Sequence, residues 1–270
     1  MKRKIFAVVM TVMLLMSVVV GCGTKDVASE TTKENTSVEY QMVAPKDAVD
    51  KATEVHLLDV REWDKYVKGR VANSEWCPIF PLEDESLEEN MKSYAEKHLK
   101  DGKEIYIICN SGAKGAQKTT DVLKGAGINE TLIYTVEGGA EALKDIHNVL
   151  STNRADEAIK WQYAKGEDVL KEIGSQIVDV RDDDAYAKGH LENSVQVALK
   201  DIESPEAQTE TFNLAKTLDN SKPVYFLCYS GNKCAKTAVS VFKDAGFSLD
   251  NLFIIENGAK DEAVSAAFVK

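Results

Sequence analysis

Cysteine is scarce in this sequence, which has five cysteines among 270 residues. Apart from Cys22 near the N-terminus, they are Cys77, Cys109, Cys228 and Cys234. Four thiols at these spacings are too few and too unevenly placed for a disulfide framework or a zinc site. We therefore expect neither a metal nor a bound cofactor, and the thiols need another reason to be present.

Basic residues are also in deficit. The chain has 33 Lys and Arg against 44 Asp and Glu, which gives a formal net charge of −11 at pH 7. An acidic chain of this kind is a poor candidate for binding nucleic acid or an anionic lipid surface. Its overall field also repels anionic substrates, so any anion-binding site has to be built from local groups.

Long apolar runs are missing except at the N-terminus, where Ile5 to Val20 is almost unbroken. This run follows a basic segment and is short for a membrane span, so it fits the hydrophobic region of a signal peptide. The residues Val19 to Cys22 resemble a bacterial lipobox, which implies cleavage before Cys22 and a lipid on its sulfur. We expect an extracytoplasmic protein that is lipid-anchored to the bacterial cell membrane. The alternative is an uncleaved anchor in which Cys22 is incidental.

The rest of the chain is a duplication with a period of about 120 residues. The segment His56–Glu62 matches Gln176–Asp182, and Tyr66–Val71 matches Tyr186–Leu191, both at a shift of 120. Cys228 matches Cys109 at a shift of 119. A period this long indicates a duplicated domain and not the unit of a solenoid.

Each repeat alternates predicted strands and helices. In the first repeat these are strand Val55–Val60, helix Leu87–Leu99, strand Glu104–Ile108, helix Gly115–Lys124, strand Thr131–Val136 and helix Ala140–Leu150. In the second they are Gln176–Val180, Glu206–Leu218, Val224–Leu227, Ala235–Lys243, Leu252–Ile255 and a helix from Ala259. Such alternation predicts an α/β fold, with a parallel sheet and helices on both of its faces.

A cysteine ends the apolar central strand of each repeat and opens a short loop before the next helix. The loop backbone can turn its N–H groups inward, and the helix adds its positive N-terminal end. Such a site binds anions and favours the thiolate, and active groups in parallel sheets lie beyond the strands' carboxyl ends. We predict that Cys109 and Cys228 are catalytic. The predicted anion-binding residues are Asn110, Ser111, Gly112, Ala113 and Lys114 in the first loop, and Tyr229, Ser230, Gly231, Asn232 and Lys233 in the second.

Four motifs occur in the same order in the chain: Asp-Val-Arg at a strand end, Tyr-x-x-Gly-His-Leu, Cys-x-Ser-Gly-x-Lys and Glu-Gly-Gly. Together they resemble the rhodanese domain, and most of the set occurs twice. The resemblance implies two tandem rhodanese-like domains, each a parallel sheet with helices on both faces. The expected division is a signal peptide at 1–21, a flexible tether at 22–39, domain 1 at 40–150, a linker at 151–160 and domain 2 at 161–270.

The resemblance implies a sulfurtransferase. A donor such as thiosulfate or a persulfide gives its outer sulfur to the cysteine, and cyanide or a thiol removes it from the resulting persulfide. Lys114 and Lys233 stand where the family usually has Arg, so we expect a weaker grip on thiosulfate, because Lys lacks the bidentate fork. Two alternatives remain: a thiol-redox or sulfide-sensing module, and a binding module that keeps the fold without catalysis.

Other candidate positions have two interpretations each. Arg61 and Arg181 either pair with acids such as Glu62 or line the substrate mouth. Cys77 is either a buried core thiol or a neighbour of the first loop. Cys234 is either a small residue at a helix start or a resolving thiol for Cys228.

Cysteine phosphatases have a related architecture but place Arg six residues after the cysteine. Gly115 and Cys234 occupy that position here. Phosphatase activity is therefore the less expected enzymatic function.

Overall fold

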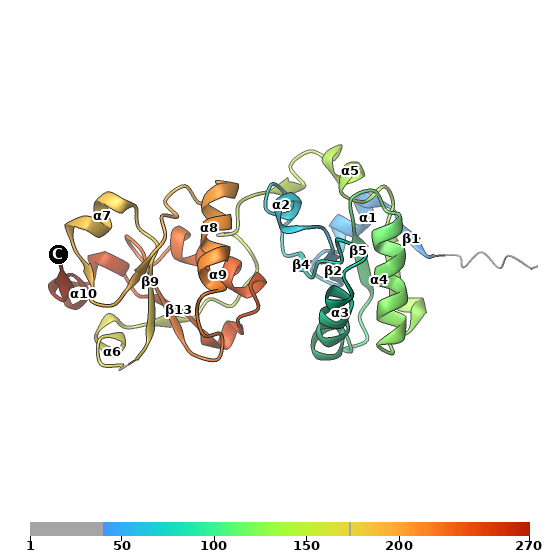
Figure 1. The fold of residues 1–270 in the computed structure, drawn as a ribbon. Coiled ribbons are helices and arrows are strands. Elements are labelled where there is room, and N and C mark those ends of the chain that lie inside the picture. The colour runs from blue at the N-terminus through green and yellow to red at the C-terminus, as the bar shows by residue number, and fades with distance from the viewer. Residues whose placement is uncertain (1–39, 173) are drawn as a thin grey trace, which may run out of the picture. The chain divides into compact units, whose positions relative to one another are not determined.

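The computed structural model describes residues 40–172 and 174–270 (Figure 1). The expected signal peptide, the lipobox with Cys22 and the tether lie outside the described residues. The predicted α/β fold with two parallel sheets is confirmed. Within the described ranges, no helix is both long enough and apolar enough to cross a membrane.

The first domain is built on five parallel strands in the order β1-β6-β5-β2-β4. Their bounds are Met42–Val43 (β1), His56–Asp59 (β2), Glu75–Trp76 (β4), Ile105–Ile108 (β5) and Ile133–Val136 (β6). Strand β5 pairs with β2 on one side and with β6 on the other. All four of its residues are buried, as expected for an apolar strand in the middle of a parallel sheet.

Helices cover both faces of this sheet. The helices are α1 (Pro45–Asp50), α2 (Trp63–Tyr66), α3 (Glu85–His98), α4 (Lys114–Gly125) and α5 (Gly139–Lys144), with the 3₁₀ turn η1 at Glu130–Leu132. Figure 1 shows α3 and α4 side by side, and these two helices contact each other. Ile105 and Ile107 pack with Met91 of α3, whereas Tyr106 and Ile108 pack with Leu143 of α5. Alternate residues of β5 therefore face opposite layers of helices.

The second domain repeats this order of strands, as β8-β13-β12-β9-β11. The strands are β8 (Tyr163–Ala164), β9 (Gln176–Asp179), β11 (Val195–Gln196), β12 (Val224–Leu227) and β13 (Leu252–Ile255). The helical segments are α6 (Gly166–Val169), α7 (Asp183–Lys188), α8 (Pro205–Ala215), α9 (Lys233–Asp244), η2 (Leu249–Asn251), η3 (Gly258–Lys260) and α10 (Glu262–Ala266). Strand β12 holds the central position that β5 holds in the first domain.

The predicted helix over Ala140–Leu150 is wrong in its second half. Helix α5 ends at Lys144, and Asn148 adopts a left-handed φ of 60°. Leu150 then enters strand β7 (Leu150–Ser151), which pairs antiparallel with β3 (Arg70–Val71). The pairing supplies hydrogen-bond partners to the backbone N–H and C=O groups of β3. These groups would have no partner strand if the helix continued to Leu150. It also extends the first domain into the segment expected to be the linker.

The second domain closes in the same way. Strand β14 (Phe268–Val269) pairs antiparallel with β10 (His190–Leu191). The predicted helix from Ala259 is split into η3 and α10, because Asp261 leaves the helical conformation and caps α10 through the N–H groups of Ala263 and Val264.

Candidate active site

The two cysteines lie at equivalent places, at the carboxyl ends of the central strands. Cys109 follows β5 and is 1% exposed, and Cys228 follows β12 and is 2% exposed. Cys109 packs in one cluster with Ala116 of α4, and Cys228 packs with Ala235 of α9. The Cys109 side chain therefore lies on the face of its sheet that α4 covers, and the Cys228 side chain lies on the face that α9 covers. In each domain, this is the helix that follows the cysteine loop.

A glycine in left-handed conformation bends each loop. Gly112 has a φ of +65° and Gly231 a φ of +64°. A Cβ atom on Gly112 would lie 2.7 Å from the Val136 carbonyl oxygen, and one on Gly231 would lie 2.7 Å from that of Ile255. Only glycine fits these positions, for both conformational and steric reasons.

A second loop, after β6 or β13, is pressed against each cysteine loop. The N–H of Ala140 donates to the Cys109 carbonyl at 2.8 Å, and the N–H of Ala259 donates to the Cys228 carbonyl at 2.8 Å. A Cβ atom on Gly139 or on Gly258 would collide with the same carbonyl oxygen. These two glycines therefore let the second loop approach the cysteine loop closely.

In the second domain, a backbone amide points at the sulfur. The N–H of Asn232 donates to Cys228 Sγ at 3.3 Å. Asn232 directly precedes the 12-residue helix α9, whose N-terminal end adds positive potential. The Cys228 sulfur therefore faces both an amide donor and the positive end of a helix.

The remaining loop residues surround the cysteines at different depths. Asn110 and Tyr229 are half-buried. Lys114 and Lys233 are exposed and form the first residues of α4 and α9. The exposed small residues are Ser111, Ala113 and Ser230. The Tyr229 hydroxyl accepts a hydrogen bond from the N–H of Asp182 at 2.9 Å, so the second loop is bonded to the start of α7.

Arg61 and Arg181 are buried and paired with the aspartate two residues before them. Arg61 Nε donates to Asp59 Oδ1 at 2.9 Å, and its Nη2 donates to Asp59 Oδ2 at 2.6 Å and to the Gly69 carbonyl at 2.9 Å. Arg181 makes the same bonds with Asp179 and the Gly189 carbonyl. The acid partner is therefore Asp59 and not Glu62, and most of each guanidinium's donor capacity is used in holding the strand end.

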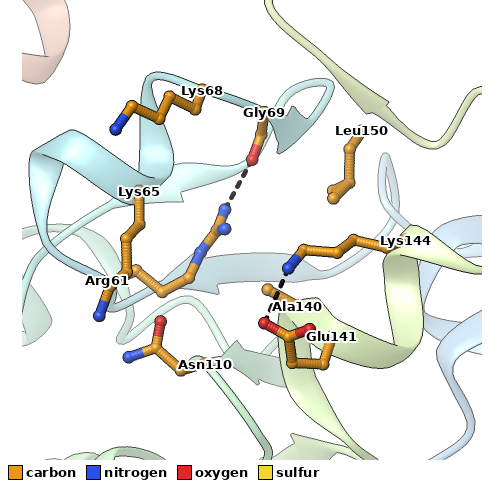
Figure 2. A pocket seen from close by; sticks show the side chains of 9 residues that line it. All are labelled: Arg61, Lys65, Lys68, Gly69, Asn110, Ala140, Glu141, Lys144 and Leu150. Carbon is orange, nitrogen blue, oxygen red and sulfur yellow. Dashed lines mark hydrogen bonds and ion pairs between the residues drawn. The ribbon is translucent and has the colours of Figure 1, made fainter.

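Arg61 also lines a basic pocket of about 200 Å³ beside the first cysteine loop (Figure 2). The pocket is lined by Arg61, Lys65, Lys68, Gly69, Asn110, Ala140, Glu141, Lys144 and Leu150. Figure 2 shows the Lys144 ammonium next to the Glu141 carboxylate, at 2.7 Å. Carboxylates pair with three of the four basic groups: Asp59 with Arg61, Glu62 with Lys65 and Glu141 with Lys144. The lining therefore carries one positive charge, that of Lys68, in excess of these ion pairs. Cys109 does not line it, because its side chain lies on the α4 side of the sheet whereas Ala140 lies on the α5 side.

The second domain replaces several of the residues that form this pocket. Ala185 stands in place of Lys65, and Ala263 in place of Lys144. Phe268 stands in place of Leu150, and its ring lies over the Arg181 guanidinium with 4.7 Å between the Arg carbon and the ring centroid. The two domains therefore differ in the surroundings of their cysteine loops, although the loops have the same backbone course.

The other two described cysteines are unlike each other. Cys77 is buried in the core cluster that contains Cys109, and burial raises its pKa to about 12. Of the two interpretations of Cys77, the structure supports the buried core thiol. Cys234 is half-buried in the first turn of α9, and burial followed by the nearby charge of Cys228 raises its pKa to about 11. Within the described ranges, no cluster of three or more His, Cys, Asp or Glu residues could hold a metal ion.

Comparisons with known proteins agree with the duplicated architecture. The family model of the rhodanese-like domain matches twice, over residues 45–145 and 163–261. The thiosulfate sulfurtransferase GlpE of Pseudomonas paraeruginosa is 34% identical over 79 residues, which are 29% of this chain and 63% of that protein. The protein of the same name from Pseudomonas aeruginosa is 33% identical over an equal span. The chain thus covers less than two thirds of these relatives.

Solved structures show more distant similarity. A thiosulfate sulfurtransferase from Pseudomonas aeruginosa aligns with 84% of this chain and 42% of its own, at 13% identity and a TM-score of 0.39. An As-Sb reductase from Leishmania major aligns with 43% of this chain and 87% of its own, at 21% identity and a TM-score of 0.35.

Proposed function

Because the chain belongs to the rhodanese family, whose domain it carries twice, we propose that it is a sulfurtransferase working through a cysteine persulfide. The thiolate of Cys109 or Cys228 attacks the outer sulfur of thiosulfate or of a persulfide donor. The donor's S–S bond breaks, and sulfite or a thiolate leaves with the electron pair. A thiophilic acceptor, cyanide or a thiol, then takes the outer sulfur and regenerates the cysteine thiolate.

The observation that carries this proposal is the bond from the Asn232 N–H to Cys228 Sγ, at the base of a loop that only glycine at position 231 can form. Donors fixed in this way stabilise negative charge on the sulfur before and during transfer, at no cost in reorganisation. The loop of Cys109 has the same glycine conformation, so the same chemistry is proposed for the first domain.

Charge near the loops supports an anionic donor. The chain as a whole is acidic and repels anions. In the first domain, the basic pocket beside Asn110 offsets this field locally, which favours the approach of an anion to that loop. Lys114 and Lys233 each add one exposed positive charge at a helix start. A single ammonium holds an oxyanion less specifically than a guanidinium, which favours persulfide or polysulfide donors over thiosulfate.

The proposal is tested by turnover of thiosulfate and cyanide to thiocyanate and sulfite. The full chain is compared with Cys109→Ser, Cys228→Ser and the double variant, with Cys77→Ser as the control at a core thiol. Each single variant retains part of the turnover, and the double variant has none. A trapped persulfide adds about 32 Da, the mass of one sulfur atom, to the peptide of either cysteine.

Other outcomes identify other functions. Turnover that is lost only with Cys228→Ser makes the first domain structural. Absence of turnover and of added mass with thiosulfate and with polysulfide overturns the enzymatic proposal and favours a binding module.

Membrane attachment is a separate part of the proposal, supported by the residue pattern from the basic residues 2–4 to Cys22. The mature protein begins at a lipid-modified Cys22 on the outer side of the cytoplasmic membrane or in the outer membrane. Mass spectrometry of the mature N-terminal peptide reveals the lipid, and Cys22→Ser releases the protein from the membrane fraction. An unmodified Cys22 in membrane-bound protein contradicts this part alone.

A further inference from the structure

The two cysteine loops differ at the sixth residue after the cysteine, which is Gly115 in the first domain and Cys234 in the second. Both are the second residue of their helix. The residues that precede the helices have nearly the same backbone conformation, with φ and ψ of −125° and −124° at Ala113 and of −133° and −129° at Asn232. The two positions are therefore geometrically equivalent.

The first domain shows how close a side chain at this position comes to the cysteine. A Cβ atom on Gly115 would lie 3.2 Å from Cys109 Cβ. The Cβ atoms of a disulfide are about 3.5–4.5 Å apart, so a small adjustment from this placement reaches disulfide geometry. Cys234 packs against the same hydrophobic cluster as Cys228, and both are free thiols. The second domain thus places two thiols within reach of each other across one short loop.

A second exchange makes room for the thiol of Cys234. In the first domain, a Cβ atom on Gly115 would lie 2.5 Å from Cε2 of Phe80, so the Phe80 ring occupies the space beside that residue. Phe80 follows the buried Ile79, and Lys200 follows the equivalent buried Leu199. The Lys200 side chain is exposed, and its Nζ contacts Asp182 Oδ2 at 2.7 Å. The ring that bars a side chain in the first domain is absent from the second.

We propose that Cys234 resolves the Cys228 persulfide, so that the second domain releases its sulfur as hydrosulfide; this inference rests on the sulfurtransferase function proposed for Cys228. A bond forms between Cys234 Sγ and Cys228 Sγ, and the bond between Cys228 Sγ and the outer sulfur breaks. The outer sulfur takes the electron pair and the proton of the Cys234 thiol, and leaves as HS⁻. The sulfane sulfur is reduced, the two cysteines are oxidised to a disulfide, and an external dithiol or pair of thiols reduces that disulfide for the next cycle.

This chemistry divides the two domains. Burial raises the pKa of Cys234, so its thiol is protonated near neutral pH. Because the thiolate is the nucleophile, this proton passes to the outer sulfur as Cys234 Sγ attacks Cys228 Sγ. The first domain has Gly115 where the second has Cys234, so it has no second thiol at this position. The Cys109 persulfide therefore reacts only when an external acceptor is supplied. One domain is therefore a sulfur carrier, and the other converts sulfane sulfur to hydrosulfide at the expense of thiols.

The test uses the full chain carrying Cys109→Ser, reduced, freed of small thiols and kept anaerobic. Thiosulfate is added as the donor, with inorganic polysulfide as a second donor. Sulfite and hydrosulfide are measured over time, and samples are alkylated and digested with trypsin. Trypsin cuts after Lys233, so a disulfide joins the peptide Thr217–Lys233 to the tripeptide Cys234–Lys236, whereas a persulfide stays on the larger peptide.

We expect one hydrosulfide and one joined peptide pair for each Cys228 persulfide formed. Adding Cys234→Ser leaves the persulfide on Cys228 and stops hydrosulfide release until an external thiol is supplied. Adding Lys200→Phe, which restores the aromatic ring while keeping both thiols, slows formation of the joined peptides. The Cys228→Ser chain, in which only the first domain reacts, holds its persulfide on Cys109 without releasing hydrosulfide.

The outcomes separate the two proposals. A Cys228 persulfide that persists with Cys234 present, or hydrosulfide release that is equal with and without Cys234, overturns this inference and leaves the sulfurtransferase function standing. If neither donor adds sulfur to Cys228, both proposals fail for the second domain.

Discussion

The backbone N–H of Asn232 donates to Cys228 Sγ at 3.3 Å, and this contact depends on the residue before it. Gly231 has a left-handed φ of +64°, which turns the chain so that the next amide points back toward the sulfur. The conformation of Gly231 therefore determines both the stability of the loop and the hydrogen bond to the Cys228 sulfur.

Replacing Gly231 by Ala should cost both stability and activity. A Cβ atom there would lie 2.7 Å from the Ile255 carbonyl oxygen and 3.0 Å from the backbone nitrogen of Asn257. Gly246→Ala is the matched control, because Gly246 also has a positive φ but has open space around its Cβ position. The left-handed conformation costs about 1–2 kcal/mol in both variants.

Overpacking adds about 1–3 kcal/mol in Gly231→Ala alone. Urea unfolding measures the difference, and sulfur transfer by the second domain is measured in a Cys109→Ser chain. We expect transfer to fall sharply for Gly231→Ala and to persist for Gly246→Ala. Equal stability and equal activity in the two variants would show that the contact with Ile255 is not needed.

The core of each domain follows from local patterns in the sequence. Strand β5 is apolar at all four positions and is buried at all four, so its central place in the sheet is predictable from the strand alone. The Ser-Gly and Glu-Gly-Gly motifs predict tight loops, because glycine tolerates positive φ. The place of the cysteines at the strand ends follows from the same elements.

Features that depend on distant parts of the chain were not predictable in this way. The basic pocket takes Lys65 from α2, Asn110 from the cysteine loop and Lys144 from α5, and no local motif joins them. The exchange of Phe80 for Lys200 has an effect only because Phe80 folds beside Gly115, at the start of a helix more than 30 positions later in the chain. The end of α5 does not show in the local helical pattern, because the pairing of Leu150 with Val71 overrides that pattern.

The stability of the first domain should fall as the pH rises through the raised pKa of His56, which lies above the ordinary histidine value of about 6.5. Its Nδ1 lies 2.6 Å from Glu75 Oε1, and its Nε2 lies 3.0 Å from Asp101 Oδ1. The hydrogen bond with Glu75 is the main cause that raises the pKa of His56 above 6.5 in the folded state. A raised folded pKa contributes stability that is complete below the unfolded pKa and is lost as the pH passes through the folded value.

Urea unfolding of the wild type between pH 5.5 and pH 8.5 tests this, with the range chosen to span about one unit or more on each side of the free-histidine pKa. The His56→Gln chain should lose less stability across this range than the wild type. His147→Gln, at an exposed histidine of the same domain, should behave like the wild type. If the stability of all three chains changes with pH to the same extent, His56 is not the cause of the pH dependence.

The basic pocket should assist anionic donors in the first domain. In a Cys228→Ser chain, Lys68→Glu reverses one charge of the pocket and should raise the KM for thiosulfate about fivefold at low salt. The effect should shrink toward the wild-type value in high salt, because ions screen exposed charges. Lys188→Glu in the same chain is the control, since Lys188 occupies the equivalent position in the second domain. If both reversals raise KM equally, the net charge of the protein and not the pocket is responsible.

The lysines at the helix starts should limit the use of thiosulfate. Lys233→Arg, in a Cys109→Ser chain, restores a planar guanidinium that can donate two parallel hydrogen bonds to an oxyanion. We expect kcat/KM for thiosulfate to rise about fivefold, equivalent to about 1 kcal/mol, mainly through KM. Lys236→Arg is the control, because Lys236 lies on the same helix but over the Trp161 ring, 5.4 Å from its centroid. With polysulfide as donor the gain should be smaller, because a polysulfide chain lacks the oxygen atoms that a guanidinium fork grips. A Lys233→Arg chain no better with thiosulfate than Lys236→Arg would mean that this side chain does not contact the donor.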